Sequence, residues 1–134
     1  MSVFSWKYVK PLKSKDDINH FESTNNVKLP DDIISCFLNH NGGRPDKKTF
    51  DTENSKERVL KTLLSFNEGD IETIWSAFSV ISSTQSQLVP IASDPSGNFI
   101  CYNASMQCIE LWLHETDTTE KISDNFTAFL DMLY

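Results

Sequence analysis

The stretch LVPIASDPSGNFICYNASMQCIELWLH, residues 88–114, contains the pattern that decides the fold. Three runs rich in β-branched and aromatic side chains, at 88–93, 99–103 and 107–114, favour strands. The segment 94–98 between the first two runs combines proline, serine and glycine, which favour a turn. We therefore expect an antiparallel meander of three strands in this part of the chain.

Apolar residues at helical spacing predict four helices around the meander. The expected helices cover residues 16–25, 30–40, 70–81 and 126–133. The third is expected to start at Asp70, which can cap a helix, and to carry Ile71 on its apolar stripe. In the last helix, Ile122 falls one turn before Phe126 and extends the same apolar face.

The remaining segments complete the predicted architecture. The run 58–66 fits a helix by its spacing, but the break at 67–70 that follows it favours a strand. A short edge strand is expected near 49–51, and the polar stretch 115–121 is expected to be a connection. This order predicts one α+β domain over residues 1–134. Its N-terminal helices, central helix and C-terminal helix should pack on one side of an antiparallel sheet.

The formal net charge of -7 is unevenly distributed along the chain. Residues 1–61 carry 11 Lys and Arg against 9 Asp and Glu, whereas residues 62–134 set Lys121 alone against 10 carboxylates. This balance argues against nucleic acid as a partner, because phosphates require a basic face. A negative surface on the second half would instead steer a cationic partner. The alternative interpretation is that the carboxylates only keep the domain in solution.

The lack of a recognisable targeting signal and the cysteine usage favour a cytoplasmic protein that does not contact a membrane. Lys7 and Lys10 near the start of the chain are not followed by an apolar segment, so the N-terminus does not resemble a signal peptide. No apolar run approaches the roughly 20 residues that a membrane helix needs. Three cysteines, an odd number without a tight pair, suit reduced thiols in a cytosol.

The cysteines raise two further alternatives. In a symmetric 99–114 hairpin Cys101 faces Cys108, and the pair could form a disulfide that a reducing cytosol disfavours. Cys36 and His40 share a helix face and could bind zinc with them, but no second local pair supports such a site. The spacing also nominates no nucleophile with a base and an orienting group. We therefore expect no metal, no cofactor and no catalytic residues.

Several motifs, in a fixed order, resemble the Smi1/Knr4 (SUKH) superfamily over nearly the whole chain. They are Leu29-Pro30-Asp31-Asp32, Phe37-Leu38, Asn41-Gly42-Gly43-Arg44-Pro45, Leu88-Val89-Pro90-Ile91-Ala92, Asp94, Gly97-Asn98 and Trp112-Leu113-His114-Glu115. Each motif alone is weak, but their order over one small domain is specific. Part of the pattern also has a structural interpretation, with Gly42 ending a helix and Gly97 supplying a positive φ in a turn.

The resemblance implies an α+β fold and, in bacteria, an immunity protein that binds and neutralises a polymorphic toxin, often a nuclease. Fungal relatives look like regulators of cell-wall synthesis, so a regulatory protein-interaction module is the alternative. Neither branch implies an enzyme, and an unrecognised hydrolase is the third hypothesis. Independently of the family, a nuclease must hold phosphate and is usually basic, so an acidic inhibitor suits it.

The meander also supplies the expected partner-binding face. With Phe99 opposite Glu110, strand alternation points Leu111 to the core and Trp112 outward, as an exposed aromatic anchor. A register slip of one residue would reverse these faces. The predicted binding residues are Asp94, Asn98, Phe99, Glu110, Trp112, His114, Glu115 and Asp117. The expected partner is a cognate basic toxin, and the sequence does not indicate an oligomeric state.

Overall fold

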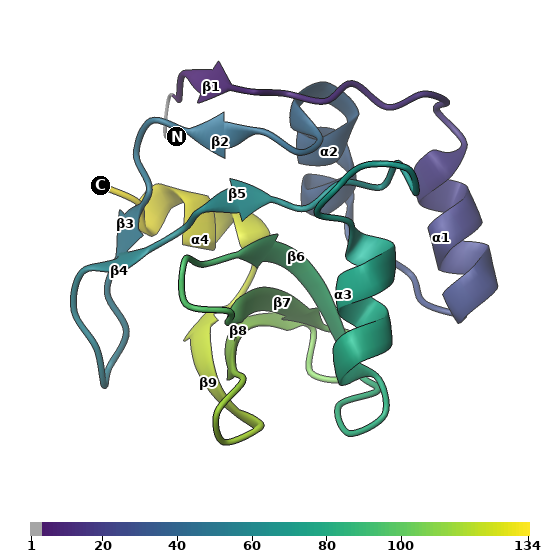
Figure 1. Cartoon of the computed structure of the whole chain (residues 1–134). Coiled ribbons are helices and arrows are strands. Elements are labelled where there is room, and N and C mark those ends of the chain that lie inside the picture. The colour runs from purple at the N-terminus through teal and green to yellow at the C-terminus, as the bar shows by residue number, and fades with distance from the viewer. Residues whose placement is uncertain (1–3) are drawn as a thin grey trace.

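The computed structural model describes residues 4–134, so residues 1–3 of the N-terminal stretch assessed for a signal peptide lie outside the described residues. The elements, in chain order, are β1 (Trp6–Lys7), α1 (Asp17–Asn25), α2 (Asp31–His40), β2 (Arg44–Pro45), β3 (Thr49–Phe50), β4 (Arg58–Val59), β5 (Thr62–Leu63), α3 (Ile74–Ile81), β6 (Leu88–Ser93), β7 (Phe99–Asn103), β8 (Cys108–Leu113), β9 (Thr118–Ser123) and α4 (Phe126–Met132) (Figure 1). Helices and an antiparallel sheet confirm the predicted α+β class.

An antiparallel sheet in the order β5-β6-β7-β8-β9 forms the centre of the fold. The predicted bounds of β6 and β7 are confirmed, as is a turn with positive φ at Gly97. The β1–β2 and β3–β4 pairs form two separate two-stranded sheets. One backbone hydrogen bond joins the β1–β2 pair to β5, because the amide of Leu63 donates to the carbonyl of Gly43 at 2.9 Å. Figure 1 shows this pair on the β5 side of the central sheet, whose other edge is β9.

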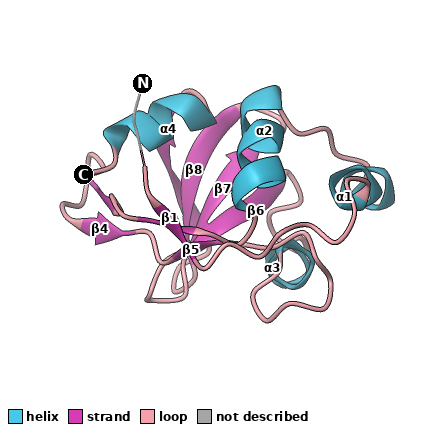
Figure 2. Cartoon of the chain, turned by 90° about the horizontal axis from the view of Figure 1, so that it is seen from above, coloured by secondary structure: helices cyan, strands magenta, loops and turns pink. Residues whose placement is uncertain are grey.

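The main hydrophobic core lies on one face of this sheet. Ile100 and Leu111 contribute to it from the strands, while Phe37 of α2 and Phe129 of α4 cover them. Figure 2 shows α2 and α4 next to each other, with α3 apart from them. This agrees with the expectation that the N-terminal and C-terminal helices share one side of the sheet.

The central helix departs from that expectation. α3 contributes Ile74 and Ala77 to the main core, but its last residue, Ile81, packs in a second cluster with Cys101 and Trp112. Because side chains alternate along a strand, these two residues lie on the face opposite Ile100 and Leu111. α3 therefore runs beside β6 and covers part of the second face.

The predicted start of α3 is wrong. The helix begins at Ile74, and its N-cap is Thr73, whose hydroxyl accepts from the amide of Ser76 at 3.0 Å. The Asp70 carboxylate is held in the preceding loop, where it accepts from the hydroxyl of Ser65 at 2.6 Å. Ile71 consequently lies outside the helix and is 93% exposed.

The run 58–66 is extended, as predicted, and forms β4 and β5. The polar stretch expected to be a connection is instead mostly strand, because β9 covers residues 118–123. Ile122 belongs to this strand and not to the helical face of α4. β9 escaped prediction because it is an edge strand whose side chains are largely exposed, so it lacks an alternating apolar pattern.

The predicted register of the β7–β8 hairpin is also wrong. Asn103 pairs with Cys108 and closes the loop, which places Cys101 opposite Glu110 instead of Cys108. The side chain of Asn103 sets this register, because its Oδ1 accepts from the amides of Ser105 and Met106 in the loop. The error is two residues, an even number, so the predicted assignment of side chains to the two faces is retained.

Asn41 joins three parts of the fold that are distant in sequence. Its Nδ2 donates to the carbonyl of Lys10 at 2.8 Å and to the hydroxyl of Ser65 at 2.9 Å. Its Oδ1 accepts from the amide of Phe66 at 2.9 Å. The buried side chain thus connects the end of α2 to the segment after β1 and to the loop before α3. Gly42, with a φ of +68°, then turns the chain into β2.

We expect Asn41→Ala to lower the free energy of unfolding by about 3 kcal/mol, because buried hydrogen-bonding groups lose their partners. The measurement is urea denaturation followed by circular dichroism. Asn39→Ala is the matched control, since Asn39 is exposed on the same helix and its Nδ2 donates to the carbonyl of Ser35 within that helix. A loss of stability no larger for Asn41→Ala than for this control would contradict the connecting role.

Candidate functional site

Carboxylates gather around β9, the last strand of the sheet. We call this group the acidic edge; its members are Asp51, Glu53, Glu110, Glu115, Asp117, Glu120 and Asp124. The first two come from the β3–β4 loop, and the amide of Asn54 in that loop donates to Glu120 at 3.1 Å. Glu110 comes from β8, opposite Lys121 of β9. The acidic edge is therefore built from both halves of the chain.

A groove of about 580 Å³ runs along β9. Its acidic lining residues are Asp51, Glu53, Glu120 and Asp124, and Ile122 and Met132 add apolar surface. Lys121 also lines the groove, where its ammonium group contacts Asp124 at 2.6 Å. The groove therefore presents an excess of negative charge to a partner.

Three carboxyl groups of the acidic edge have pKa values below the ordinary range. Hydrogen bonds from the Glu57 amide and the Tyr134 hydroxyl lower the pKa of Asp51. The hydrogen bond and charge of Lys121 lower the pKa of Asp124. The indole N–H of Trp112, which donates at 2.7 Å, lowers the pKa of Asp117. These groups are fully ionised at neutral pH.

The cations of the first half do not neutralise the acidic residues of the second half around β9. Lys61 pairs with Glu72 at 3.2 Å, and Arg58 lies 4.0 Å from Asp94. Among residues 4–134, no Lys or Arg from the first half lies within 4.0 Å of an acidic-edge carboxylate of the second half. Lys56 lies 3.9 Å from Asp51, and this exposed ion pair joins two residues of the first half.

Asp94 and Asn98, two of the predicted binding residues, are buried and hold the β6–β7 turn. Oδ1 of Asp94 accepts from the amides of Ser96 and Asn98 at 2.9 and 2.8 Å. Oδ1 of Asn98 in turn accepts from the amide of His114 at 3.0 Å. These contacts join the β6–β7 turn to the end of β8. Both buried side chains therefore hold in place the backbone that carries the exposed residues of this surface.

The expectation that Trp112 is exposed is wrong. Its side chain lies on the predicted face, but only 7% is exposed because Ile81 and Leu88 pack against it. Phe99, partly buried, stacks on it with ring centroids 5.8 Å apart. The sequence predicted the face correctly but gave no sign that α3 would cover it. Through its indole N–H, Trp112 positions Asp117 at the surface.

The other predicted residues are more accessible. Glu115 and His114 are exposed in the β8–β9 turn, and the His114 ring lies over Gly97. Glu110 is half-buried and accepts from Nδ2 of Asn103 at 3.0 Å. Glu115 and Asp117 thus lie in the turn that leads into β9, and Glu110 lies opposite Lys121 within the β8–β9 hairpin. Asp51, Glu53, Glu120 and Asp124 were not predicted, because recognising them required knowing that β9 is a strand beside the β3–β4 loop.

The sequence matches the SMI1 / KNR4 family (SUKH-1) over residues 13–132. The chain belongs to this family. SUKH-1 proteins are commonly immunity proteins, and they generally act as binding modules without catalysis of their own. No curated protein and no solved structure matches the chain. Within residues 4–134 of this SUKH-1 chain, no helix has the length and apolar character needed to cross a membrane.

The thiols of this SUKH-1 domain are protonated at neutral pH. Burial raises the pKa of Cys36 to about 12, and it also raises the pKa values of Cys101 and Cys108. Cys36 packs against the main core, whereas Cys101 lies in the second cluster. In the described part of the chain, no three His, Cys, Asp or Glu side chains are grouped so that they could hold a metal ion.

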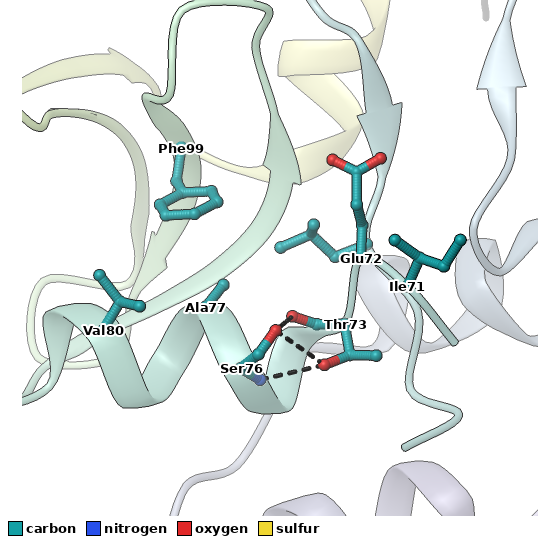
Figure 3. Close-up of a pocket in the computed structure, with 8 residues that line it drawn as sticks. Ile71, Glu72, Thr73, Ser76, Ala77, Val80 and Phe99 are labelled. Carbon is teal, nitrogen blue, oxygen red and sulfur yellow. Dashed lines mark hydrogen bonds between the residues drawn. The ribbon is translucent and has the colours of Figure 1, made fainter. Parts of the chain in front are cut away.

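A small apolar groove of about 180 Å³ borders Phe99 on the second face of the sheet. Figure 3 shows Val80 and Ala77 of α3 and Ile71 of the preceding loop around this groove, with Phe99 across from the helix. Ile71 and Val80 are exposed. The SUKH-1 sequence did not predict this surface, because Ile71 was placed on a buried helical stripe.

We expect Trp112→Phe to raise the pKa of Asp117 towards its ordinary value, because the substitution removes the indole donor. The rise should be partial, since Thr84 and Gln85 also donate to this carboxyl group. NMR titration of the side-chain carboxyl carbon measures it. Because folding lowers the pKa of Asp117, its carboxylate stabilises the folded protein at pH values above the ordinary aspartate pKa. This contribution is lost as the pH falls through the lowered pKa.

Asp124 is the internal control in the same spectra, because Lys121, and not the Trp112 indole, lowers its pKa. An Asp117 pKa that does not move in Trp112→Phe would show that the indole does not position this carboxylate.

Proposed function

We propose that this chain is an immunity protein that binds a cognate basic toxin and neutralises it through the acidic edge. The observation that carries the proposal is the set of seven carboxylates around β9, with Lys56 and Lys121 as the cations among them. Family membership supports the same role, since SUKH-1 proteins commonly bind toxins. The expected toxin class is a nuclease, because an enzyme that holds phosphate needs a basic surface.

Charge complementarity explains how such a complex would form. A negative edge steers a positive partner and can raise the association rate about 10-fold to 1000-fold at low salt. Added salt screens this attraction. The toxin's phosphate-binding cations are then contacted by carboxylates, which occludes its active site. Because the targets of a nuclease are intracellular, this function places the protein in the cytoplasm.

The predicted binding residues take different roles in this proposal. Glu115 and Asp117 would contact the cations of the toxin directly, and Glu53 and Glu120 would extend this contact along the groove. Glu110 would border the contact, because it lies on the face opposite Glu120. Phe99 and His114 would border the interface. Buried Asp94, Asn98 and Trp112 would act indirectly, because they fix the turns that carry the contacting side chains.

Co-expression with the product of the adjacent gene tests the proposal. We expect a stoichiometric complex that survives gel filtration, and loss of the toxin's activity in a cleavage assay with the purified components. An adjacent gene that encodes no basic toxin domain, or a toxin that stays active in the presence of a molar excess of this protein, would contradict the immunity function. It would favour the regulatory alternative.

Removing charge from the acidic edge should slow association with that toxin. We expect the triple variant Glu53→Gln, Glu115→Gln and Glu120→Gln to reduce the association rate constant about 10-fold at low salt, with a smaller change in the dissociation rate. Stopped-flow fluorescence at several salt concentrations measures both rates. The difference from the unmodified protein should shrink as the salt concentration rises.

The matched control is Asp16→Asn, Asp31→Asn and Glu68→Gln, which also removes three exposed carboxylates, at α1, at α2 and in the loop before α3. We expect a much smaller effect from this control. Equal slowing by both variants would show that net charge alone guides the toxin and that the acidic edge has no special role.

A further inference from the structure

A further groove, of about 470 Å³, lies between the β1–β2 pair and the β4–β5 segment. We call it the basic groove; its charged lining residues are Lys7, Arg44, Lys48, Lys61 and Asp46. Four cations against one carboxylate make it positive on a chain whose net charge is -7. The groove shares no lining residue with the groove along β9, and the binding of a basic toxin makes no use of it.

The cations of the basic groove are only partly neutralised. Lys7 and Arg44 are directly opposite each other in the β1–β2 register, an arrangement of like charges that destabilises a strand pair. Oδ1 of Asp46 already accepts from the amides of Ser5 and Lys47. Lys61 has a carboxylate partner in Glu72. A bound anion would relieve the repulsion that remains between Lys7 and Arg44.

The remainder of the lining is apolar and aromatic. Pro45 and Leu60 are buried below the cations, and Val59 and Pro95 complete the lining. Tyr8 is 69% exposed and has a φ of 58°, a backbone conformation that is uncommon for residues other than glycine. The guanidinium carbon of Arg44 lies 5.4 Å from the centre of the Tyr8 ring. The groove therefore combines an apolar floor with a positive rim.

We propose that the basic groove binds a short acidic segment of a partner protein. The carboxylates of the segment would pair with Lys7, Arg44 and Lys48, and an apolar side chain would contact Val59 and Pro95 on the floor. A peptide fits better than nucleic acid for two reasons. A phosphate backbone would make no contact with the apolar floor. In addition, a protein of net charge -7 repels a long polyanion more strongly than a segment with few charges.

The test is an NMR titration of the labelled full-length chain with the blocked hexapeptide acetyl-ELEDLE-amide at low salt. We expect amide shifts at residues 7, 8, 44, 48 and 61 and a submillimolar dissociation constant. The uncharged peptide acetyl-QLQNLQ-amide and a six-nucleotide oligothymidylate should each bind at least about 10-fold more weakly. The double variant Lys7→Gln with Lys48→Gln should raise the dissociation constant of the acidic peptide about 10-fold. The control variant Lys15→Gln with Lys28→Gln, which changes exposed lysines beside α1, should leave this constant unchanged.

Several outcomes would overturn this inference. They are no binding at millimolar peptide, shifts confined to other surfaces, equal binding of the uncharged peptide, tighter binding of the oligonucleotide, or equal weakening by both lysine variants. Unchanged dispersion of the variants' amide spectra shows that each remains folded. Toxin binding by Lys7→Gln with Lys48→Gln is measured in parallel, so failure here is distinguishable from failure of the immunity function.

Discussion

The hydrogen bonds of Asn41 hold the rest of the structure in place. One buried amide side chain binds the backbone after β1, a hydroxyl in the loop before α3 and the amide of Phe66. It therefore helps to fix where the β1–β2 pair stands relative to β5, and the Leu63 to Gly43 hydrogen bond joins that pair to the central sheet. Asn67 adds to this connection, because its side chain binds the carbonyl of Pro11 and the amide of Lys13. The arrangement of charge depends on it too, because the cations of β1 and β2 are carried by the segments that Asn41 positions.

Charge is segregated along the order of the strands. Cations line the groove beside β1, β2 and β5, while carboxylates surround β9 at the other end of the sheet. The linear division of charge between the halves of the sequence is preserved only in part in three dimensions, because Glu72 and Asp94 of the second half lie beside Lys61 and Arg58 of the first half. Asp51 and Glu53 are the reverse case. The β3–β4 loop carries these two residues of the first half to the acidic edge. Since exposed charges are screened over about 8 Å at physiological ionic strength, this separation lets the two surfaces attract partners of opposite sign.

The parts of the fold that follow from local chemistry could be predicted from the sequence. The bounds of β6 and β7 follow from branched side chains around a Pro and Gly turn, and α1 and α2 follow from apolar spacing behind acidic starts. The parts decided by contacts between distant segments could not. Asn103 sets a hairpin register that composition does not show, and α3 buries Trp112 although its strand pattern suggests an exposed position. The acidic edge was identified only in part for the same reason, since no local signal relates residue 51 to residue 124.

The exposed character of β9 has a consequence for how such a family can diversify. Most of its side chains contribute little to the core, so substitutions there are nearly neutral for folding and yet alter the surface that a partner meets. Selection can thus retune specificity on this strand without a compensating change elsewhere. A host that must keep pace with rapidly evolving competitors would gain from an arrangement in which recognition and stability are encoded by separate residues.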